Sequence, residues 1–121
     1  MIGIGTDLVE LDRFRLALQR TPGLVDRLFS EDEKRYSLRK KDPTERFAAR
    51  FAAKEAVMKA MGVGLWKFPL KDIEVVKAPS GAPSVRLHGK AARMAEERGV
   101  TEWRLTLTHT ERVAQAIAVA L

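Results

Sequence analysis

The sequence predicts a single α+β domain with one long helix packed on a mostly antiparallel sheet. Its 121 residues suffice for one modest core, and 45% hydrophobic with 31% charged residues is the balance of a globular protein. Two helix-capping motifs follow each other in the first half of the chain. Short segments of alternating apolar residues, typical of antiparallel strands, fill most of the second half. We therefore expect residues 1–121 to form one domain.

An opening strand is predicted for residues 2–8. One face of this strand carries the larger side chains Ile2, Ile4, Thr6 and Leu8, and the other carries Gly3, Gly5 and Asp7. Because glycine has no side chain, another element can approach closely on the Asp7 face. Leu11, Phe14 and Leu18 recur at helical spacing, so a short helix should follow and end before Pro22 and Gly23.

Two helices should begin at recognisable caps. Ser30 and Glu33 form a capping box, which predicts a helix over about residues 31–40. Asp42 as the cap, with Pro43 in the first turn, predicts the longest helix over about residues 43–61. Gly62 and Gly64 end that helix. Its apolar stripe faces the core and consists of Phe47, Phe51, Met58 and Met61.

The second half predicts mainly strands. A hairpin with a Pro- and Gly-containing turn comes first, then a short helix, then two antiparallel strands. The corresponding ranges are 73–76, 78–83 and 85–87 for the hairpin, 90–98 for the helix, and 103–108 and 113–121 for the last strands.

Composition limits the partners and the compartment. The 22 Lys and Arg residues exceed the 16 Asp and Glu residues, and the net charge of +6 favours a nucleic acid, a nucleotide cofactor or an acidic protein as partner. The absence of cysteine excludes disulfides and thiolate chemistry and fits a reducing compartment. The N-terminus has no basic segment of a signal peptide, and the apolar segment 113–121 has half the length of a membrane helix. We therefore expect a soluble, cytoplasmic protein without a membrane partner.

A few residues could carry chemistry. Glu55 and Lys59 lie four apart on the long helix, so their side chains share one face. The neighbouring small residues should leave room for a ligand beside them; they are Ala48, Ala52, Ala56 and Gly62. The alternative is an exposed ion pair that adds only ~0.3–0.5 kcal/mol to helix stability. Asp7 alone could equally be a cap or turn residue. Together, however, Asp7 and Glu55 could hold Mg²⁺, which proteins commonly bind through one or two carboxylates with water and phosphate oxygens.

Histidine offers a further candidate. His109 lies at the end of a predicted strand, on the face of Trp103, Leu105 and Leu107. It is either a histidine at the edge of the core or an imidazole that accepts a proton or contacts a phosphate. His88, beside Gly89, suggests no role.

Three sequence blocks resemble a known family. They are residues 5–10 (GTDLVE), residues 50–60 (RFAAKEAVMKA) and residues 107–110 (LTHT). Their order and spacing, and the length of the chain, closely resemble the bacterial holo-[acyl-carrier-protein] synthases, the small group I type of 4′-phosphopantetheinyl transferase. The resemblance covers essentially the whole chain, and the central block is the most specific.

The resemblance implies an activity and a set of site residues. Such enzymes transfer the 4′-phosphopantetheine moiety of coenzyme A to a serine hydroxyl of apo acyl carrier protein, with Mg²⁺, and release 3′,5′-ADP in support of fatty acid biosynthesis. The implied metal ligands are Asp7 and Glu55, and the implied coenzyme A contacts are Lys59, Gly62, Pro83 and His109, with Lys59 at the phosphate under attack. Arg13 would face an acidic helix of the carrier protein.

The resemblance also implies a homotrimer with active sites between protomers. The chain departs from the family in one turn, residues 80–83, where Ala82 replaces a basic residue often found there. The base that takes the serine proton stays open among Glu55, a metal-bound water and His109.

Two other functions compete with an enzyme. A nucleic-acid-binding module would use the basic excess, but residues 31–46 interleave six cations with five acids, and two Trp, one Tyr and five Phe include no stacking motif. A purely structural trimeric scaffold leaves the combination of Asp7, Glu55 and Lys59 without a purpose. We therefore expect an enzyme that does not act on nucleic acid.

Overall fold

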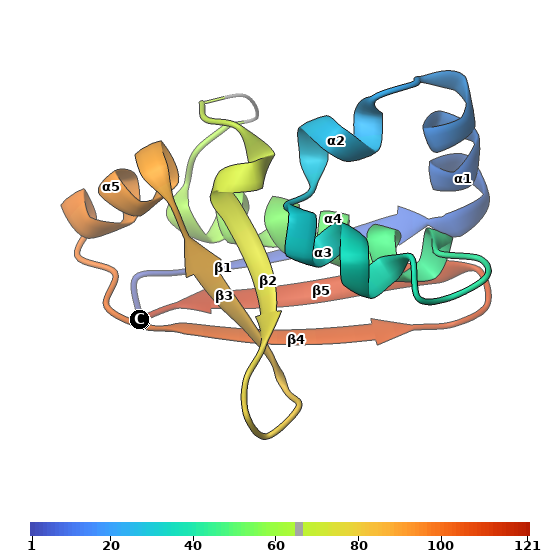
Figure 1. The fold of residues 1–121 in the computed structure, drawn as a ribbon. Coiled ribbons are helices and arrows are strands. Elements are labelled where there is room, and N and C mark those ends of the chain that lie inside the picture. The colour runs from blue at the N-terminus through green and yellow to red at the C-terminus, as the bar shows by residue number, and fades with distance from the viewer. Residues whose placement is uncertain (65–66) are drawn as a thin grey trace.

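Helices and antiparallel strands make up the computed structural model, which describes residues 1–64 and 67–121 (Figure 1). The elements are β1 (Gly3–Glu10), α1 (Leu11–Arg20), α2 (Leu24–Leu28), α3 (Glu31–Ser37), α4 (Thr44–Met61), the 3₁₀ turn η1 (Leu70–Asp72), β2 (Ile73–Lys77), β3 (Pro83–Leu87), α5 (Gly89–Glu97), β4 (Trp103–His109) and β5 (Val113–Ala120). The predicted α+β class, with one long helix on antiparallel strands, is confirmed.

The strands form two antiparallel sheets. The larger has the order β1–β5–β4, and the smaller is the hairpin β2–β3. The predicted pairing of the last two strands is confirmed, and β5 also pairs along its whole length with β1. In this register Ala116 of β5 lies between Asp7 of β1 and Leu107 of β4. The central strand thus joins the two ends of the chain.

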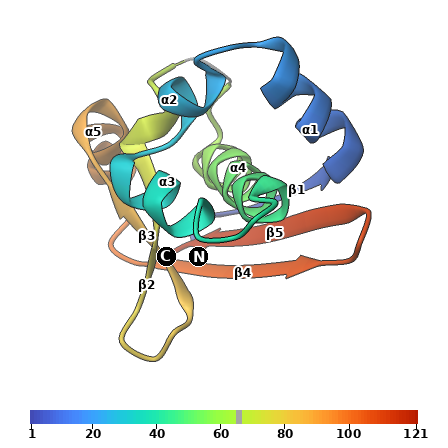
Figure 2. The same cartoon turned by 45° about the vertical axis from the view of Figure 1, so that its right-hand side comes forward.

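Small residues allow α4 to lie directly on the larger sheet (Figure 2). On β5 the helix-facing residues are Ala114, Ala116, Ala118 and Ala120, all buried. A Cβ atom at Gly3 would overlap the carbonyl oxygen of Ala60, and one at Gly5 would overlap that of Ala56. The predicted close approach on the glycine face of β1 is therefore confirmed, and α4 is the element that approaches.

The alanines of α4 serve this packing as well. Ala48, Ala52 and Ala56 are completely buried. The expectation that they leave room for a ligand is therefore wrong, because core neighbours fill that space. Figure 2 shows α4 between the larger sheet and the layer of α1, α2 and α3. Any space beside Glu55 must come from other elements.

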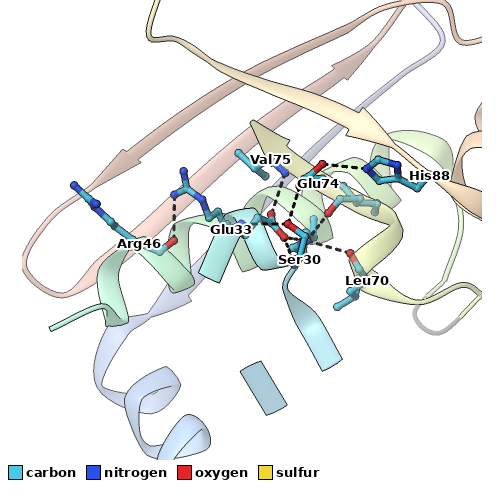
Figure 3. Close-up of polar contacts among 10 residues, drawn as sticks. Ser30, Glu33, Arg46, Leu70, Glu74, Val75 and His88 are labelled. Atoms are coloured by element: carbon cyan, nitrogen blue, oxygen red, sulfur yellow. Dashed lines mark hydrogen bonds and ion pairs between the residues drawn. The ribbon is translucent and has the colours of Figure 1, made fainter. Parts of the chain in front are cut away.

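A buried polar network joins α3, α4 and β2 (Figure 3). The predicted capping box of α3 is present, with Ser30 Oγ accepting from the Glu33 amide and Glu33 Oε1 accepting from the Ser30 amide at 2.9 Å. Glu33 Oε1 also accepts from Lys54 Nζ at 2.8 Å, and Glu33 Oε2 accepts from the Val75 amide at 2.9 Å. The Lys54 ammonium additionally donates to the carbonyl oxygens of Leu70 and Ile73. The Glu33 carboxylate and the Lys54 ammonium thus connect η1 and β2 to the long helix α4.

One predicted helix boundary differs from the structure, and one helix was not predicted. The helix α3 ends at Ser37 rather than near residue 40. Beyond it, backbone bonds tighten to three-residue spacing, from Arg39 to Tyr36 and from Lys40 to Ser37, where the cations of residues 39–41 crowd together. The short helix α2 was not predicted, since five residues are too few for a periodic signal.

The predicted cap of the long helix is off by one residue, because α4 begins at Thr44 and its N-cap is Pro43, without a side-chain cap bond. Asp42 Oδ1 accepts from the Thr44 amide at 3.1 Å, and Pro43 already has helical angles of φ −81° and ψ −2°. Bonds from Thr44 and from the Arg15 guanidinium lower the pKa of the Asp42 carboxyl.

The sheet face opposite α4 stays uncovered in a single chain. It carries the even-numbered side chains of β1, and Ile4 and Leu8 are 59% and 58% exposed. Ile117 of the central strand is exposed on the same face, since it pairs with Thr6. Exposed apolar patches are common at surfaces through which proteins associate.

No helix within residues 1–64 and 67–121 is both long and apolar enough to cross a bilayer.

Candidate functional site

A cavity of about 520 Å³ lies between β1, α1, α2 and α4. Its apolar wall includes Phe14, Leu24, Leu28 and Phe51. Its charged lining residues are Asp7, Glu10, Arg13 and Glu55. The two acids predicted to share a metal therefore open on the same space, together with the arginine predicted to meet the carrier protein.

Local structure explains why the two acids meet. Asp7 lies on the helix-facing side of β1, two residues after Gly5, where the strand lies against α4. Glu55 projects from α4 toward the same end of the cavity. Partial burial raises the pKa of the Glu55 carboxyl, the nearby Asp7 charge raises it further, and Lys59 opposes the shift. The three groups therefore act on one another electrostatically.

Lys59 bridges from the helix to the strand. Its Nζ atom lies 3.2 Å from Asp7 Oδ1 and donates to the Thr6 carbonyl oxygen at 2.9 Å. The sequence suggested Glu55 as its partner within the helix, but the ammonium contacts β1. Lys59 therefore does not form the exposed ion pair within the helix that was the alternative. Its contacts instead connect α4 to β1 next to Asp7.

The donor set fits Mg²⁺. Asp7 and Glu55 supply hard carboxylate oxygens, and Mg²⁺ typically takes one or two of these and completes its octahedron with water and phosphate oxygens. Among the residues that the structure describes, no group of three or more His, Cys, Asp or Glu could hold a metal by itself. The arrangement thus suits a cation that is shared with a phosphate-bearing substrate rather than one caged by protein.

The other candidate coenzyme A contacts lie apart from these acids within one chain. His109 Nε2 is 3.3 Å from Glu45 Oε1, at the start of α4. Glu45 precedes Glu55 by ten residues, about 15 Å along a helix. Pro83 opens β3 after a turn that projects past β4 in Figure 1. Gly62 ends α4 three residues after Lys59, with φ at 71°. The single chain therefore places only Gly62 near Asp7, Glu55 and Lys59.

Arg13 projects from α1 at the cavity rim. Its side chain is 83% exposed, and its nearest acid, Glu10, is 3.8 Å away. Other cations of this region also have acidic partners; the pairs are Arg15 with Asp12 and Asp42, Lys34 with Asp26 and Glu31, Arg35 with Asp32, and Lys40 with Glu45. Arg13 is distinguished from these paired cations by its high exposure and by its place in the lining of the cavity.

A cluster of cations around Tyr36 was not predicted. Arg46, Arg50 and Lys77 lie 4.1, 4.2 and 4.7 Å from the centre of its ring. Burial alone would raise the pKa of the Tyr36 hydroxyl, but Lys77 and the two arginines lower it overall. Arg50 is buried, and its Nε atom has no hydrogen-bond partner among the described residues. Only the four-residue spacing of the two arginines hinted at this cluster in the sequence.

The chain resembles known proteins over its whole length. The family model of the 4′-phosphopantetheinyl transferase superfamily matches residues 3–118. A holo-[acyl-carrier-protein] synthase of Streptomyces avermitilis is 47% identical over 122 residues, which span 99% of this chain and 97% of the relative. One from Caldanaerobacter subterraneus is 38% identical over 120 residues, 99% of this chain and 94% of the relative.

Solved structures agree with the sequence comparison. The holo-[acyl-carrier-protein] synthase of Neisseria meningitidis has a TM-score of 0.87 at 32% identity and covers 100% of this chain and 99% of its own. That of Helicobacter pylori, in complex with coenzyme A, has a TM-score of 0.85 at 28% identity, covering 98% of this chain and 99% of its own. With its cavity, its paired acids and this match along nearly all of its length, the chain belongs to the 4′-phosphopantetheinyl transferase superfamily.

Proposed function

We propose that the chain transfers the 4′-phosphopantetheine moiety of coenzyme A to a serine hydroxyl of apo acyl carrier protein, in support of fatty acid biosynthesis. The observation that carries the proposal is that Asp7 and Glu55 line one cavity, with Lys59 3.2 Å from Asp7, in a chain of this superfamily. Two acids with one cation suit a phosphate ligand that arrives with a divalent metal.

The transfer needs one bond to form and one to break. The serine oxygen bonds to the phosphorus that bears the pantetheine arm, and the phosphoanhydride bond to 3′,5′-ADP breaks, so that 3′,5′-ADP leaves. Such phosphoryl transfers depend mainly on positioning and on neutralising phosphate oxygens. Asp7 and Glu55 would hold Mg²⁺, which when bound polarises and orients phosphate oxygens. Lys59 supplies a further positive charge from the protein, and Gly62, just beyond it, leaves the end of α4 without a side chain.

A base must take the serine proton. Glu55 lines the cavity at the proposed metal site and could accept the proton directly or through a metal-bound water. His109 is the alternative, oriented by Glu45, but it lies about 15 Å along α4 from Glu55 within one chain. Replacing each in turn and recording the pH dependence of transfer separates the two.

We further propose that copies of the chain associate and share their sites, as a homotrimer. The exposed apolar face with Ile4, Leu8 and Ile117 gives the chain a surface to bury. His109 contacts Glu45, and neither His109 nor Pro83 lines the cavity of Asp7 and Glu55, which supports sites completed by a neighbouring protomer. Sedimentation velocity at micromolar concentration measures the number of copies directly.

The partners follow from charge. The exposed Arg13 at the cavity rim would contact an acidic helix of the carrier protein. Binding to nucleic acid is less well supported, because many of the basic side chains on α1 and α3 are paired with acids.

We place the reaction in the cytoplasm, since a chain without cysteine fits a reducing compartment.

Mass spectrometry tests the proposed activity. Apo acyl carrier protein incubated with the chain, coenzyme A and Mg²⁺ should gain the mass of one phosphopantetheine arm. Asp7→Ala and Glu55→Gln should each reduce the rate by at least about 10²-fold with the fold intact, since both are proposed to hold the metal. No mass gain with the wild-type chain would reject the activity, and wild-type rates in either variant would reject the metal site.

A further inference from the structure

The contact between Lys59 and Asp7 has a consequence for the order in which ligands bind. Asp7 is one of the two carboxylates proposed to hold the cation, and its Oδ1 atom already has the Lys59 ammonium 3.2 Å away. The Asp7 side chain is only 20% exposed, whereas that of Lys59 is 54% exposed. The lysine is therefore the more accessible partner of the pair, and its end has room to turn away from the acid.

The charges of the site make this contact matter. Asp7, Glu55 and Lys59 together carry −2 + 1 = −1 when all are ionised. A divalent cation alone would bring the total to +1 and would place two positive groups on the same carboxylate. A phosphate that arrives with the cation removes this repulsion, because it supplies negative charge to both the metal and the ammonium.

The geometry points to Lys59 as a displaceable counter-ion: we propose that it occupies Asp7 until Mg²⁺ and the phosphates of coenzyme A bind together, so that each ligand strengthens the binding of the other through this side chain. The inference rests on the proposed function, since it takes Asp7 and Glu55 as the metal ligands. It adds that Lys59 weakens the binding of the metal alone and couples the metal to the cofactor.

The side chain has a defined path between its two positions. In the structure Lys59 also donates to the Thr6 carbonyl oxygen at 2.9 Å, so its ammonium is held by two atoms of β1. Its Cβ lies against Gly5, where any side chain on the strand would collide with it. The stem is thus fixed against the strand, and only the half-exposed end can turn from Asp7 toward a phosphate at the mouth of the cavity.

Linkage makes the proposal measurable by binding alone. If the cofactor tightens Mg²⁺ binding by some factor, Mg²⁺ tightens cofactor binding by the same factor. Removing the lysine charge should raise the affinity for Mg²⁺ alone by about tenfold, the order expected for a divalent ion and a unit charge a few ångströms apart in water. The part of the coupling that passes through Lys59 should fall correspondingly.

Isothermal titration calorimetry with four proteins tests this. Mg²⁺ is titrated into the wild type, Lys59→Gln, Lys59→Arg and Lys90→Gln, each with and without coenzyme A and without carrier protein, so that no transfer occurs. Lys90 is an exposed lysine of α5 and controls for the loss of one net charge. We expect Lys59→Gln to bind Mg²⁺ alone about tenfold more tightly than the wild type and to show weaker coupling to coenzyme A. Lys59→Arg and Lys90→Gln should resemble the wild type.

Two results would overturn the proposal in different ways. Unchanged or weaker Mg²⁺ binding by Lys59→Gln, with wild-type coupling to coenzyme A, would reject the counter-ion role and leave the metal site standing. A wild-type chain that binds no Mg²⁺, with or without coenzyme A, would reject the metal site of the proposed function and the counter-ion role with it. Circular dichroism of each variant verifies that all four proteins are equally folded.

Discussion

The environment of Glu55 is suitable for binding a ligand, but it lowers the stability of the folded protein when the carboxylate is charged. Partial burial raises the pKa of its carboxyl, and the neighbouring Asp7 raises it further. The charged form is thus less favourable in the folded state than in the unfolded chain. A residue of this kind is typical of functional sites, where stability is exchanged for chemistry.

Glu55→Gln should therefore stabilise the metal-free protein. A raised pKa means that the folded state binds the proton more tightly, so Glu55 lowers the free energy of unfolding as pH rises from the unfolded to the folded pKa. In EDTA-containing buffer at pH 7 the variant should melt a few degrees above the wild type. The gain should shrink as pH falls through the folded pKa, since Glu55 is then protonated.

The control for Glu55→Gln is Glu10→Gln, which removes the same charge from an exposed side chain of the same cavity. It should show no comparable gain. A lower melting temperature for Glu55→Gln at pH 7 would show that the carboxylate supports the fold, contrary to the assignment.

For single residues, the sequence predicted which side chains line the candidate site better than it predicted the partners that these side chains contact. Asp7 and Glu55 were selected as a pair, and both line one cavity. The partner of Lys59 was not predicted, because the four-residue spacing favoured Glu55, whereas the register of β1 against α4 offers Asp7. Contacts between distant segments depend on packing that one sequence does not encode locally.

The long helix α4 is fastened by charge as well as by apolar packing. Lys54 and Glu33 are fully buried, and burial lowers the pKa of the Lys54 ammonium while Glu33 opposes the shift. Neighbouring acid Glu74 accepts from Ser30 Oγ at 2.7 Å and lies 3.0 Å from His88 Nε2 (Figure 3). His88, for which the sequence suggested no role, is thus the outer end of this network.

Lys54→Met should destabilise the protein strongly, because it leaves the Glu33 carboxylate buried without its cation. The expected loss is about 3–5 kcal/mol in urea unfolding. The double variant Glu33→Gln/Lys54→Met removes both charges and should recover a large part of it. Lys34→Met, which breaks surface pairs with Asp26 and Glu31, is the matched control and should cost at most about 1 kcal/mol. Equal losses for Lys54→Met and Lys34→Met would contradict the role given to the buried pair.

Helices with a capping motif near their start could be predicted from the sequence, and the helix without a motif or a periodic pattern could not. The Ser30 capping box placed the start of α3, and the Asp42 motif placed that of α4 to within one residue, since both motifs act within one turn. Ala48, Ala52 and Ala56 were misjudged because small residues mark close packing and open clefts alike, and only the sheet beneath them decides between the two. The helix α2 lacks a periodic signal altogether.

On the scale of the whole molecule, the net charge of +6 does not form one unpaired basic surface, because many cations lie beside acids. Many cations of α1 and α3 have acidic partners, and Arg13 is among them, with Glu10 at 3.8 Å, although its side chain stays 83% exposed. Whether such a surface docks a partner depends on which pairs form, and this is visible only in the folded chain.

Arg13→Glu should raise the KM for carrier protein about tenfold or more at low salt, and it should leave the KM for coenzyme A nearly unchanged. Charge complementarity acts mainly on the encounter rate and is screened beyond about 8–10 Å at physiological salt, so added salt should reduce the difference from the wild type. Arg93→Glu, the same charge change on α5, is the control and should have little effect. A carrier KM that responds equally to both variants, or to neither, would place the docking surface elsewhere.

The alternation along β1 makes this strand intolerant of any change in length. Its odd-numbered residues carry the glycines beneath α4 and the Asp7 carboxylate, and its even-numbered residues carry the exposed Ile4 and Leu8. Inserting or deleting one residue between Gly5 and Asp7 would reverse the faces on one side of the change, as a shift of one base alters the reading frame only downstream. Either bulky side chains would then face α4, or the carboxylate would point to the opposite side. Substitutions in β1 can affect the helix-facing side or the exposed side separately, but a single-residue insertion should disturb the relation between the two.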